Sequence, residues 1–279
     1  MKLGKNRVLQ SILVCQQKGT TRRSGIAPLT TRCMAPPKVL LFGSSGGTGR
    51  YVAKFALEAD HNVIAFVRNP AKLRSVLRQV GVSPALAENN LKILEGDLTD
   101  LNAVRSAVRD SVLSHANGDV IIECAGKPKG CQILAGKPML LPAVRAIAET
   151  MREIGLKRIL IQTGAMSSDT RLYRDPSYLF KACLVTFMSP LMCIKGMVSD
   201  NYALVPYVYR EMDDLEWIVS RPGLLAEKPS RSTDAKALGV AWSEAFVTSY
   251  VDLGEWTAKA VFNADLVHTS PSLAYVKRK

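Results

Sequence analysis

Short apolar runs alternate along this chain with longer stretches in which apolar residues recur every three or four positions. The short runs have the length of buried strands, and they occupy residues 38–42, 62–67, 91–97, 119–126, 158–164 and 215–220. The patterns between them predict helices over residues 51–57, 71–79, 101–109, 141–154 and 199–212. This alternation predicts an α/β fold, a doubly wound parallel sheet with helices on both faces.

Individual residues sharpen the ends of these helices. Asp100 can cap the helix over 101–109, because its side chain can accept hydrogen bonds from the free N–H groups of the first turn. Gly155 stands where the helix over 141–154 should end, a position that glycine favours. Pro206 falls within the pattern over 199–212 and conflicts with a continuous helix there.

The first apolar run leads into a glycine-rich turn, Gly43-Ser44-Ser45-Gly46-Gly47-Thr48-Gly49. In such a turn the first glycine allows a sharp bend, the second lets the backbone approach phosphate, and the third lets the helix pack close to the strand. Its spacing, G-x-x-G-x-x-G, differs from the more common G-x-G-x-x-G, so a glycine-rich loop without a ligand is the alternative. Because a strand precedes the turn and a helix follows it, we expect a site for a dinucleotide pyrophosphate.

Basic residues follow the second apolar run, where a βαβ unit holds the ribose of its cofactor. An acidic residue at this position would bind the 2′-hydroxyl of NAD. The chain instead has Arg68, with Lys72 and Arg74 behind it. Cations suit a 2′-phosphate, so the sequence favours NADP. The alternative is that Arg68 only extends into solvent from the end of a strand.

Composition supports a substantial core and limits the other function classes. Of the 279 residues, 47% are hydrophobic, which argues against a largely disordered chain. The net charge is +13, but residues 1–34 hold seven cations and no acid, so +6 remains for residues 35–279. A basic protein that binds an anionic cofactor explains this charge, and we expect no nucleic-acid partner. The six cysteines form no C-x-x-C pair, so reduced thiols and no metal site are expected.

The N-terminal segment differs from the rest of the chain. The first acidic residue is Glu58, and residues 1–34 are rich in Arg, Lys, Ser and Thr. This composition is typical of a mitochondrial or plastid transit peptide, whereas translation from Met34 would leave the protein in the cytoplasm. In either case we expect residues 1–36 to be a targeting or disordered segment and residues 37–279 to form one domain. No run reaches the roughly eighteen apolar residues that a membrane span needs.

Four segments together resemble the atypical short-chain dehydrogenases/reductases. They are the glycine turn, Val-Arg-Asn-Pro-Ala-Lys-Leu at 67–73, Gly-Asp-Leu-Thr-Asp at 96–100 and Leu-Glu-Trp-Ile-Val-Ser-Arg-Pro-Gly at 215–223. The order is that of the family, and the most similar branch contains the NmrA-like proteins and the flavin/biliverdin reductases. The resemblance implies a Rossmann-like, NAD(P)-binding fold, and it implies a reaction less specifically.

The resemblance also implies which residues bind the cofactor. It assigns the pyrophosphate to Gly43, Ser45, Gly46, Thr48 and Gly49, and the 2′-phosphate to Arg68 and Lys72. It places the adenine beside Asp97 and Leu98, and the nicotinamide end beside Ala125, Gly126 and Pro222. Ala125 and Gly126 are small enough for the nicotinamide ribose to pass the fourth strand. A turn-forming role is the alternative for Asp97, as is a rigid turn for Pro222.

The catalytic pair of the classical members is missing from the expected helix region of this chain. They use Tyr-x-x-x-Lys, in which the lysine lowers the pKa of the tyrosine, and none of the tyrosines before Tyr275 has a lysine four positions later. The single match to the pattern, Tyr275 with Lys279, falls at the end of the sequence and not in that helix region. Tyr202 is the candidate proton donor, and Ser167 or Thr163 could polarise a carbonyl, with a turn-forming role as the alternative for both hydroxyls. The histidine of the flavin/biliverdin reductases has no counterpart, which argues against a tetrapyrrole substrate.

These residues predict an NADPH-dependent oxidoreductase that transfers a hydride to a small planar or apolar acceptor of the carbonyl, quinone or flavin type. The apolar segment over residues 178–195 would cover the substrate, contact a membrane surface, or form an ordinary buried helix. The missing catalytic pair favours a non-catalytic NADP-binding regulatory or assembly protein as the alternative, and an isomerase or epimerase that retains NADP is a third interpretation. The sequence allows a monomer or a dimer.

Overall fold

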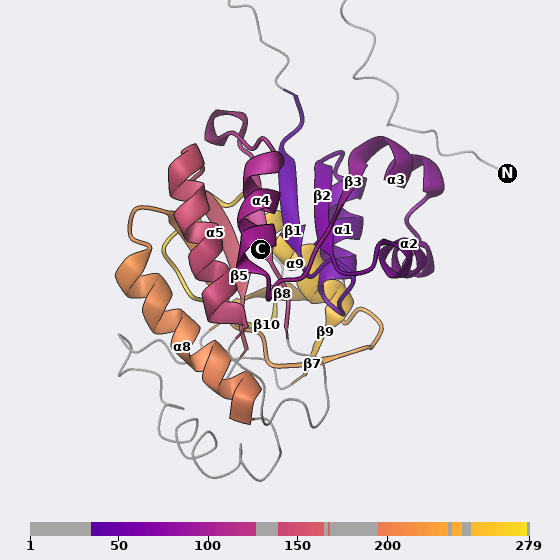
Figure 1. Ribbon diagram of the computed structural model, residues 1–279. Helices are drawn as coiled ribbons and strands as arrows, with labels where there is room; N and C mark the ends of the chain where they lie inside the picture. The colour runs from indigo at the N-terminus through magenta and orange to yellow at the C-terminus, as the bar shows by residue number, and fades with distance from the viewer. Residues whose placement is uncertain are drawn as a thin grey trace, which may run out of the picture. The chain divides into compact units, whose positions relative to one another are not determined.

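The computed structural model describes residues 35–126, 139–164, 167, 195–233, 236–241 and 247–277. Strands and helices alternate through its first part (Figure 1): β1 Lys38–Phe42, α1 Gly49–Glu58, β2 Asn62–Val67, α2 Pro70–Gln79, α3 Pro84–Asn90, β3 Leu91–Glu95, α4 Leu101–Asp110, β4 Val120–Glu123, α5 Leu140–Ile154, β5 Arg158–Gln162, α8 Lys195–Glu211 and β6 Glu216–Ser220. The remainder comprises β7 Leu224–Ala226, β8 Lys236–Ala241, β9 Val247–Ser249, α9 Tyr250–Ala260 and β10 Ser272–Lys277.

The six predicted strands form one sheet in the order β3-β2-β1-β4-β5-β6, and all its pairs are parallel. This order confirms the doubly wound, Rossmann-like fold. The chain runs outward from β1 to β3 and then returns to the other side of β1 with β4. The carboxyl ends of β1 and β4 therefore border the switch point, where such folds bind their ligands.

Two layers of helices cover the sheet. Side chains of α4, α5 and α8 form one apolar core with alternate strand residues such as Phe42 and Ile121. Side chains of α1, α2 and α9 form the second core with the residues between, such as Leu41 and Ile122. Figure 1 shows α5 beside α8, and these two helices contact each other. Strands β1, β2, β4, β5 and β6 are thus buried on both faces, which explains their nearly continuous apolar sequences, whereas the edge strand β3 has no fully buried residue.

The predicted helix ends are confirmed. The side chain of Asp100 accepts hydrogen bonds from the N–H groups of Asn102 and Ala103, at 3.0 and 3.1 Å. Gly155 has φ +70° and ends α5. Pro206 lies inside α8, which continues to Glu211 despite the missing N–H group. Burial of its neighbours Leu204, Val205 and Val208 in the core stabilises that helix.

The sequence analysis missed α3 and every element after residue 223. Helix α3 buries none of its residues, so it has no apolar stripe to reveal it, and Ser83 starts it by accepting a bond from the N–H of Leu86. Strands β7 and β9 have three residues each, which is too short for an alternating pattern. Residues 1–34 of the predicted N-terminal segment and residues 178–194 of the predicted apolar segment lie outside the described residues.

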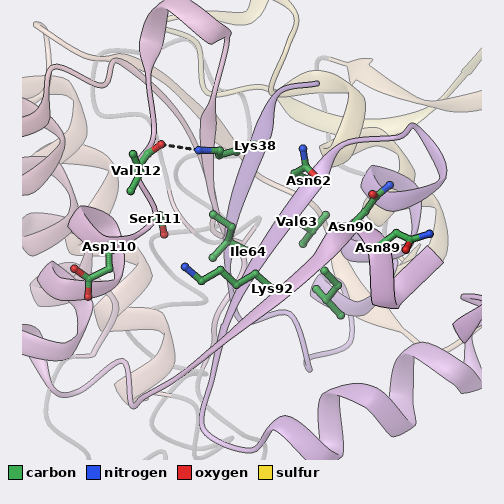
Figure 2. Close-up of a pocket in the computed structure, with 11 residues that line it drawn as sticks. Lys38, Asn62, Val63, Ile64, Asn89, Asn90, Lys92, Asp110, Ser111 and Val112 are labelled. Carbon is green, nitrogen blue, oxygen red and sulfur yellow. Dashed lines mark hydrogen bonds between the residues drawn. The ribbon is translucent and has the colours of Figure 1, made fainter. Parts of the chain in front are cut away.

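A hollow of about 320 Å³ lies at the amino ends of β1, β2 and β3, opposite the switch point (Figure 2). At its rim Lys38 Nζ donates to the carbonyl of Val112, at 2.8 Å. Val112 has φ +48°, a left-handed conformation that is strained for a β-branched residue, and its side chain lies in solvent. The hollow therefore borders a strained turn.

We expect Val112→Asn to raise the free energy of unfolding by about 1 kcal/mol, because asparagine tolerates left-handed backbone and valine does not. Urea unfolding of the two proteins measures the change. Val240→Asn is the matched control, since Val240 is also exposed but lies in β8, where valine is favourable. A Val112→Asn variant that is less stable than the wild type would contradict this account.

Candidate functional site

The glycine turn packs directly against the end of β4. Gly43 has φ +79°, and a Cβ atom on it would lie 2.5 Å from the backbone nitrogen of Ala125. A Cβ atom on Gly49 would lie 2.2 Å from the carbonyl oxygen of Gly43. Neither position can hold a larger residue without a shift of the backbone. The two glycines thus bring the end of β1, the start of α1 and the end of β4 together at the switch point.

A fourth glycine completes the turn, and sequence reasoning gave it no role. A Cβ atom on Gly47 would lie 2.5 Å from the ring of Tyr250, the first residue of α9. The ring therefore packs against the turn. Gly46 donates its N–H to the carbonyl of Gly43 at 2.9 Å and stays exposed. No sequence signal links Gly47 to Tyr250, because the two residues meet only in the folded chain.

The turn carries hydrogen-bond donors that the protein leaves unused. The N–H groups of Ser45, Gly47 and Thr48 bond to none of the described residues. The hydroxyls of Ser44 and Thr48 are buried and have no hydrogen-bond partner there either. The first turn of α1 holds no acidic residue. Unsatisfied donors at a helix start fit an anion, and a diphosphate supplies the acceptors that these groups lack.

The residue after the turn is held by an ion pair. Arg50 contacts the carboxylate of Glu227, which follows β7, and Tyr51 Oη donates to the same carboxylate at 3.0 Å. Burial is the main cause that raises the pKa of Tyr51, and the carboxylate of Glu227 adds to it. These contacts fix the start of α1 against the segment that leads to β8.

The predicted basic residues lie beyond β2. Arg68 is 72% exposed, and its guanidinium is 3.9 Å from the carboxylate of Asp97, which follows β3. Lys72 is exposed in the first turn of α2, where Asn69 accepts its backbone N–H at 2.9 Å. Both cations therefore lie at the carboxyl edge, and neither is buried in the fold.

Asp97 forms a local turn. Its Oδ1 accepts the backbone N–H and the hydroxyl of Thr99, each at 2.8 Å. These two bonds, with a smaller effect of Arg68, lower the pKa of Asp97. Asp97 thus forms a turn, the contact with adenine stays a prediction, and the carboxylate's Oδ2 is the atom that faces Arg68. Leu98 is buried beside it and packs into the core of α4 and α5.

The end of β4 contains an acid that the sequence analysis did not single out. Glu123 is fully buried, and its Oε1 accepts the backbone N–H of Ala125 at 2.7 Å. This bond holds the backbone that lies against Gly43. Burial and the neighbouring Glu123 raise the pKa of the Cys124 thiol well above its ordinary value. A Cβ atom on Gly126 would meet none of the described residues within 4 Å.

The two candidate hydroxyls after β5 already form hydrogen bonds within the protein. Thr163 and Ser167 are buried, and their hydroxyl oxygens are 2.8 Å apart. The Thr163 hydroxyl donates to the carbonyl of Ser220 at 3.1 Å, and the Ser167 hydroxyl donates to the carbonyl of Gly164 at 2.6 Å. The two hydroxyls have one proton each, and three hydrogen-bond contacts depend on these two protons. The geometry favours the turn-forming alternative for both residues.

The remaining predicted residues follow β6 or begin α8. Pro222 is buried directly after Arg221, whose backbone N–H donates to the carbonyl of Pro271 at 3.0 Å. Tyr202 lies in α8, but its side chain is outside the described residues. Among the residues that the structure describes, no group of His, Cys, Asp and Glu could hold a metal ion. In the same part of the chain no helix is long and apolar enough to cross a membrane.

Comparisons with known proteins agree with this geometry. A family model described as NAD(P)H-binding matches residues 43–263. The reductase pytE of Aspergillus terreus is 25% identical over 242 residues, which are 79% of this chain and 89% of that protein. The oxidoreductase ylbE of Lactococcus lactis superposes with a TM-score of 0.61 at 16% identity, over 86% of this chain and 91% of its own. A short-chain dehydrogenase/reductase of Veillonella parvula, solved in complex with NADP, gives 0.55 at 16% identity, over 85% and 94%.

Proposed function

This chain belongs to the NAD(P)H-binding family, and from that premise we propose that it is an NADPH-dependent reductase of a small planar or apolar acceptor. Family membership and fold agree with the resemblance to the atypical short-chain dehydrogenases/reductases. The observation that carries the proposal is the glycine turn, where N–H groups and the hydroxyls of Ser44 and Thr48 have no partner among the described residues. Bound NADPH would supply the hydride, and the protein would supply position and orientation.

Different residues at the carboxyl edge of the sheet would bind different parts of the cofactor. The glycine turn would hold the diphosphate, and the exposed Arg68 and Lys72 would pair with the 2′-phosphate at the β2 side. At the β4 side, Glu123 fixes the backbone of Ala125, which precedes Gly126. The nicotinamide end would then lie over β4 and β5. This arrangement orients the reacting carbon without a covalent step by the protein.

The acceptor would also need a proton, and we propose Tyr202 of α8 as its source. Thr163 and Ser167 already share their hydroxyl protons with each other and with two backbone carbonyls. They are therefore better placed to fix the chain after β5 than to polarise a carbonyl. Quinone and flavin acceptors can take their protons from water, so they depend least on a protein donor.

The choice of NADP over NAD can be tested at Arg68. We expect Arg68→Asp to weaken NADPH binding by roughly ten- to a hundredfold, the equivalent of about 1.5–3 kcal/mol for a charge-assisted bond to phosphate. The affinity for NADH should stay the same or rise. Titration calorimetry with both dinucleotides measures the two effects.

Arg78→Asp provides the matched control, because Arg78 is exposed on the same helix but at its far end. It should leave both affinities near those of the wild type. Unchanged NADPH binding by Arg68→Asp would remove the assignment of the 2′-phosphate to Arg68.

The second candidate is a non-catalytic NADP-binding regulatory or assembly protein of the NmrA-like type. The occupied hydroxyls of Thr163 and Ser167 favour it, because they leave the described part of the site without a free side-chain acid. Purified protein mixed with NADPH and a panel of quinones, flavins and aldehydes separates the two candidates. Tight NADPH binding without turnover of any acceptor would reject the reductase and favour the regulator.

A further inference from the structure

A guanidinium that pairs with none of the described carboxylates lies at the carboxyl end of β6. Arg221 directly follows Ser220 and is only 6% exposed. Its Nε donates to the carbonyl of Ser270 at 2.8 Å, and its Nη1 donates to the carbonyl of Ser167 at 3.3 Å. It forms no ion pair with any described acid. Two other described arginines are also largely buried, and each is paired with a glutamate: Arg50 and Arg158.

Among the described residues, this arrangement gives Arg221 no carboxylate partner and leaves some of its hydrogen-bond donors unused. A charge removed from water is costly unless an opposite charge lies beside it, and carbonyl dipoles compensate only part of that cost. A guanidinium has five N–H groups, of which these two bonds use two. Its Nη2 atom bonds to no described residue. A planar fork with free donors is suited to a carboxylate, which it can bind through two parallel bonds.

The position of Arg221 separates it from the proposed diphosphate site. Strand β6 is the third strand from β1, with β4 and β5 between them. Ser220 is paired with Gln162, so Arg221 lies beside the segment that follows β5, and it binds the carbonyl of Ser167 there. With the nicotinamide end over β4 and β5, the hydride acceptor would lie over the ends of β5 and β6. Arg221 is therefore on the acceptor side of the cofactor.

We propose that Arg221 binds a carboxylate of the hydride acceptor, so that the enzyme prefers planar acceptors that carry this anion. The inference rests on the proposed reductase function and narrows its substrate class. The two carbonyl bonds hold the guanidinium in place, and the free edge of the fork takes the carboxylate. No proton or electron passes through Arg221, which acts in recognition alone.

The test uses two acceptors that differ only in the charge. Wild-type protein with NADPH should reduce 4-formylbenzoate with a kcat/KM roughly ten- to a hundredfold above that of its methyl ester, mainly through a lower KM. In Arg221→Met this ratio should fall to about one, whereas Arg221→Lys should keep part of it because it retains the charge without the fork. Arg145→Met is the control, since Arg145 is exposed on α5, and it should keep the wild-type ratio.

Binding to the NADP⁺ complex separates this inference from the reductase function. Calorimetry with anthraquinone-2-carboxylate and its methyl ester should show tighter binding of the carboxylate by the wild type, even if no acceptor is reduced. Absence of turnover with this preference intact would reject the reductase alone. Equal binding of the two compounds by the wild type, or binding of neither, overturns the Arg221 subsite and needs no variant. An equal loss for both compounds in a folded Arg221→Met also overturns it, because a purely structural arginine would act in that way.

Discussion

Gly49→Ala should reduce the affinity for NADPH by at least about a hundredfold, roughly 2.7 kcal/mol. The added methyl would lie 2.2 Å from the carbonyl oxygen of Gly43, and neither atom can rotate away, because the backbone fixes the position of both. The start of α1 must therefore move from the end of β1. That movement displaces the N–H groups of Gly47 and Thr48, which we propose as diphosphate donors. Titration calorimetry with NADPH gives the affinity, and urea unfolding gives the accompanying loss of stability, about 1–3 kcal/mol.

Gly155→Ala distinguishes the loss of binding from a loss of stability. Gly155 has φ +70° at the end of α5, and a Cβ atom there would meet nothing within 4 Å. Alanine in this conformation should lower the free energy of unfolding by about 1 kcal/mol, and it should leave NADPH binding unchanged. A folded Gly49→Ala protein that binds NADPH as tightly as the wild type would show that the glycine turn does not hold the diphosphate.

The sequence predicted this turn because its signal is local and lies along one βαβ unit. The strands next to it are apolar on both faces, and the glycines stand at a fixed spacing between a strand and a helix. The contacts that distant segments make with the turn could not be predicted from the sequence. Tyr250 behind Gly47 and Glu227 on Arg50 come from the last third of the chain, where short strands give no periodic signal.

Buried polar residues were the hardest to predict. Glu123 and Arg221 lie at strand ends, where a sequence suggests only a turn. Their meaning depends on what surrounds them, and only the fold shows that Glu123 accepts the N–H of Ala125 while Arg221 donates to the carbonyls of Ser270 and Ser167. The same dependence explains Thr163 and Ser167, whose hydroxyls looked available until their partners were known.

A second large effect is expected at Asp252, in the first turn of α9. The carboxylate is 2% exposed and accepts four hydrogen bonds. Its Oδ1 is bonded by the hydroxyls of Ser230 and Ser232, and its Oδ2 by the backbone N–H of Arg231 and by Tyr275 Oη, both at 2.8 Å. One side chain thus joins the segment after β7, helix α9 and strand β10.

Asp252→Asn should lower the free energy of unfolding by about 3 kcal/mol at neutral pH. An amide keeps one acceptor oxygen but presents an NH₂ group to two of the four donors, so about two charge-assisted bonds of roughly 1.5 kcal/mol each are lost. Urea unfolding measures the change. Asp265→Asn is the control, because Asp265 is exposed, and it should change stability by less than about 0.5 kcal/mol.

The pH dependence of this difference tests its electrostatic origin. Burial alone would raise the pKa of Asp252. The hydrogen bonds from Ser230, Arg231, Tyr275 and Ser232 together have the larger effect and lower it, so the net direction is downward. A carboxyl whose folded pKa is depressed contributes stability that is present above its unfolded pKa, about 3.9, and is lost as the pH falls through the folded pKa. The wild type should therefore keep its advantage over Asp252→Asn above about pH 5 and lose it progressively as the pH falls below that and through the depressed folded pKa. A difference that stays constant across this range would mean that the carboxylate charge contributes nothing, and that shape alone accounts for the loss.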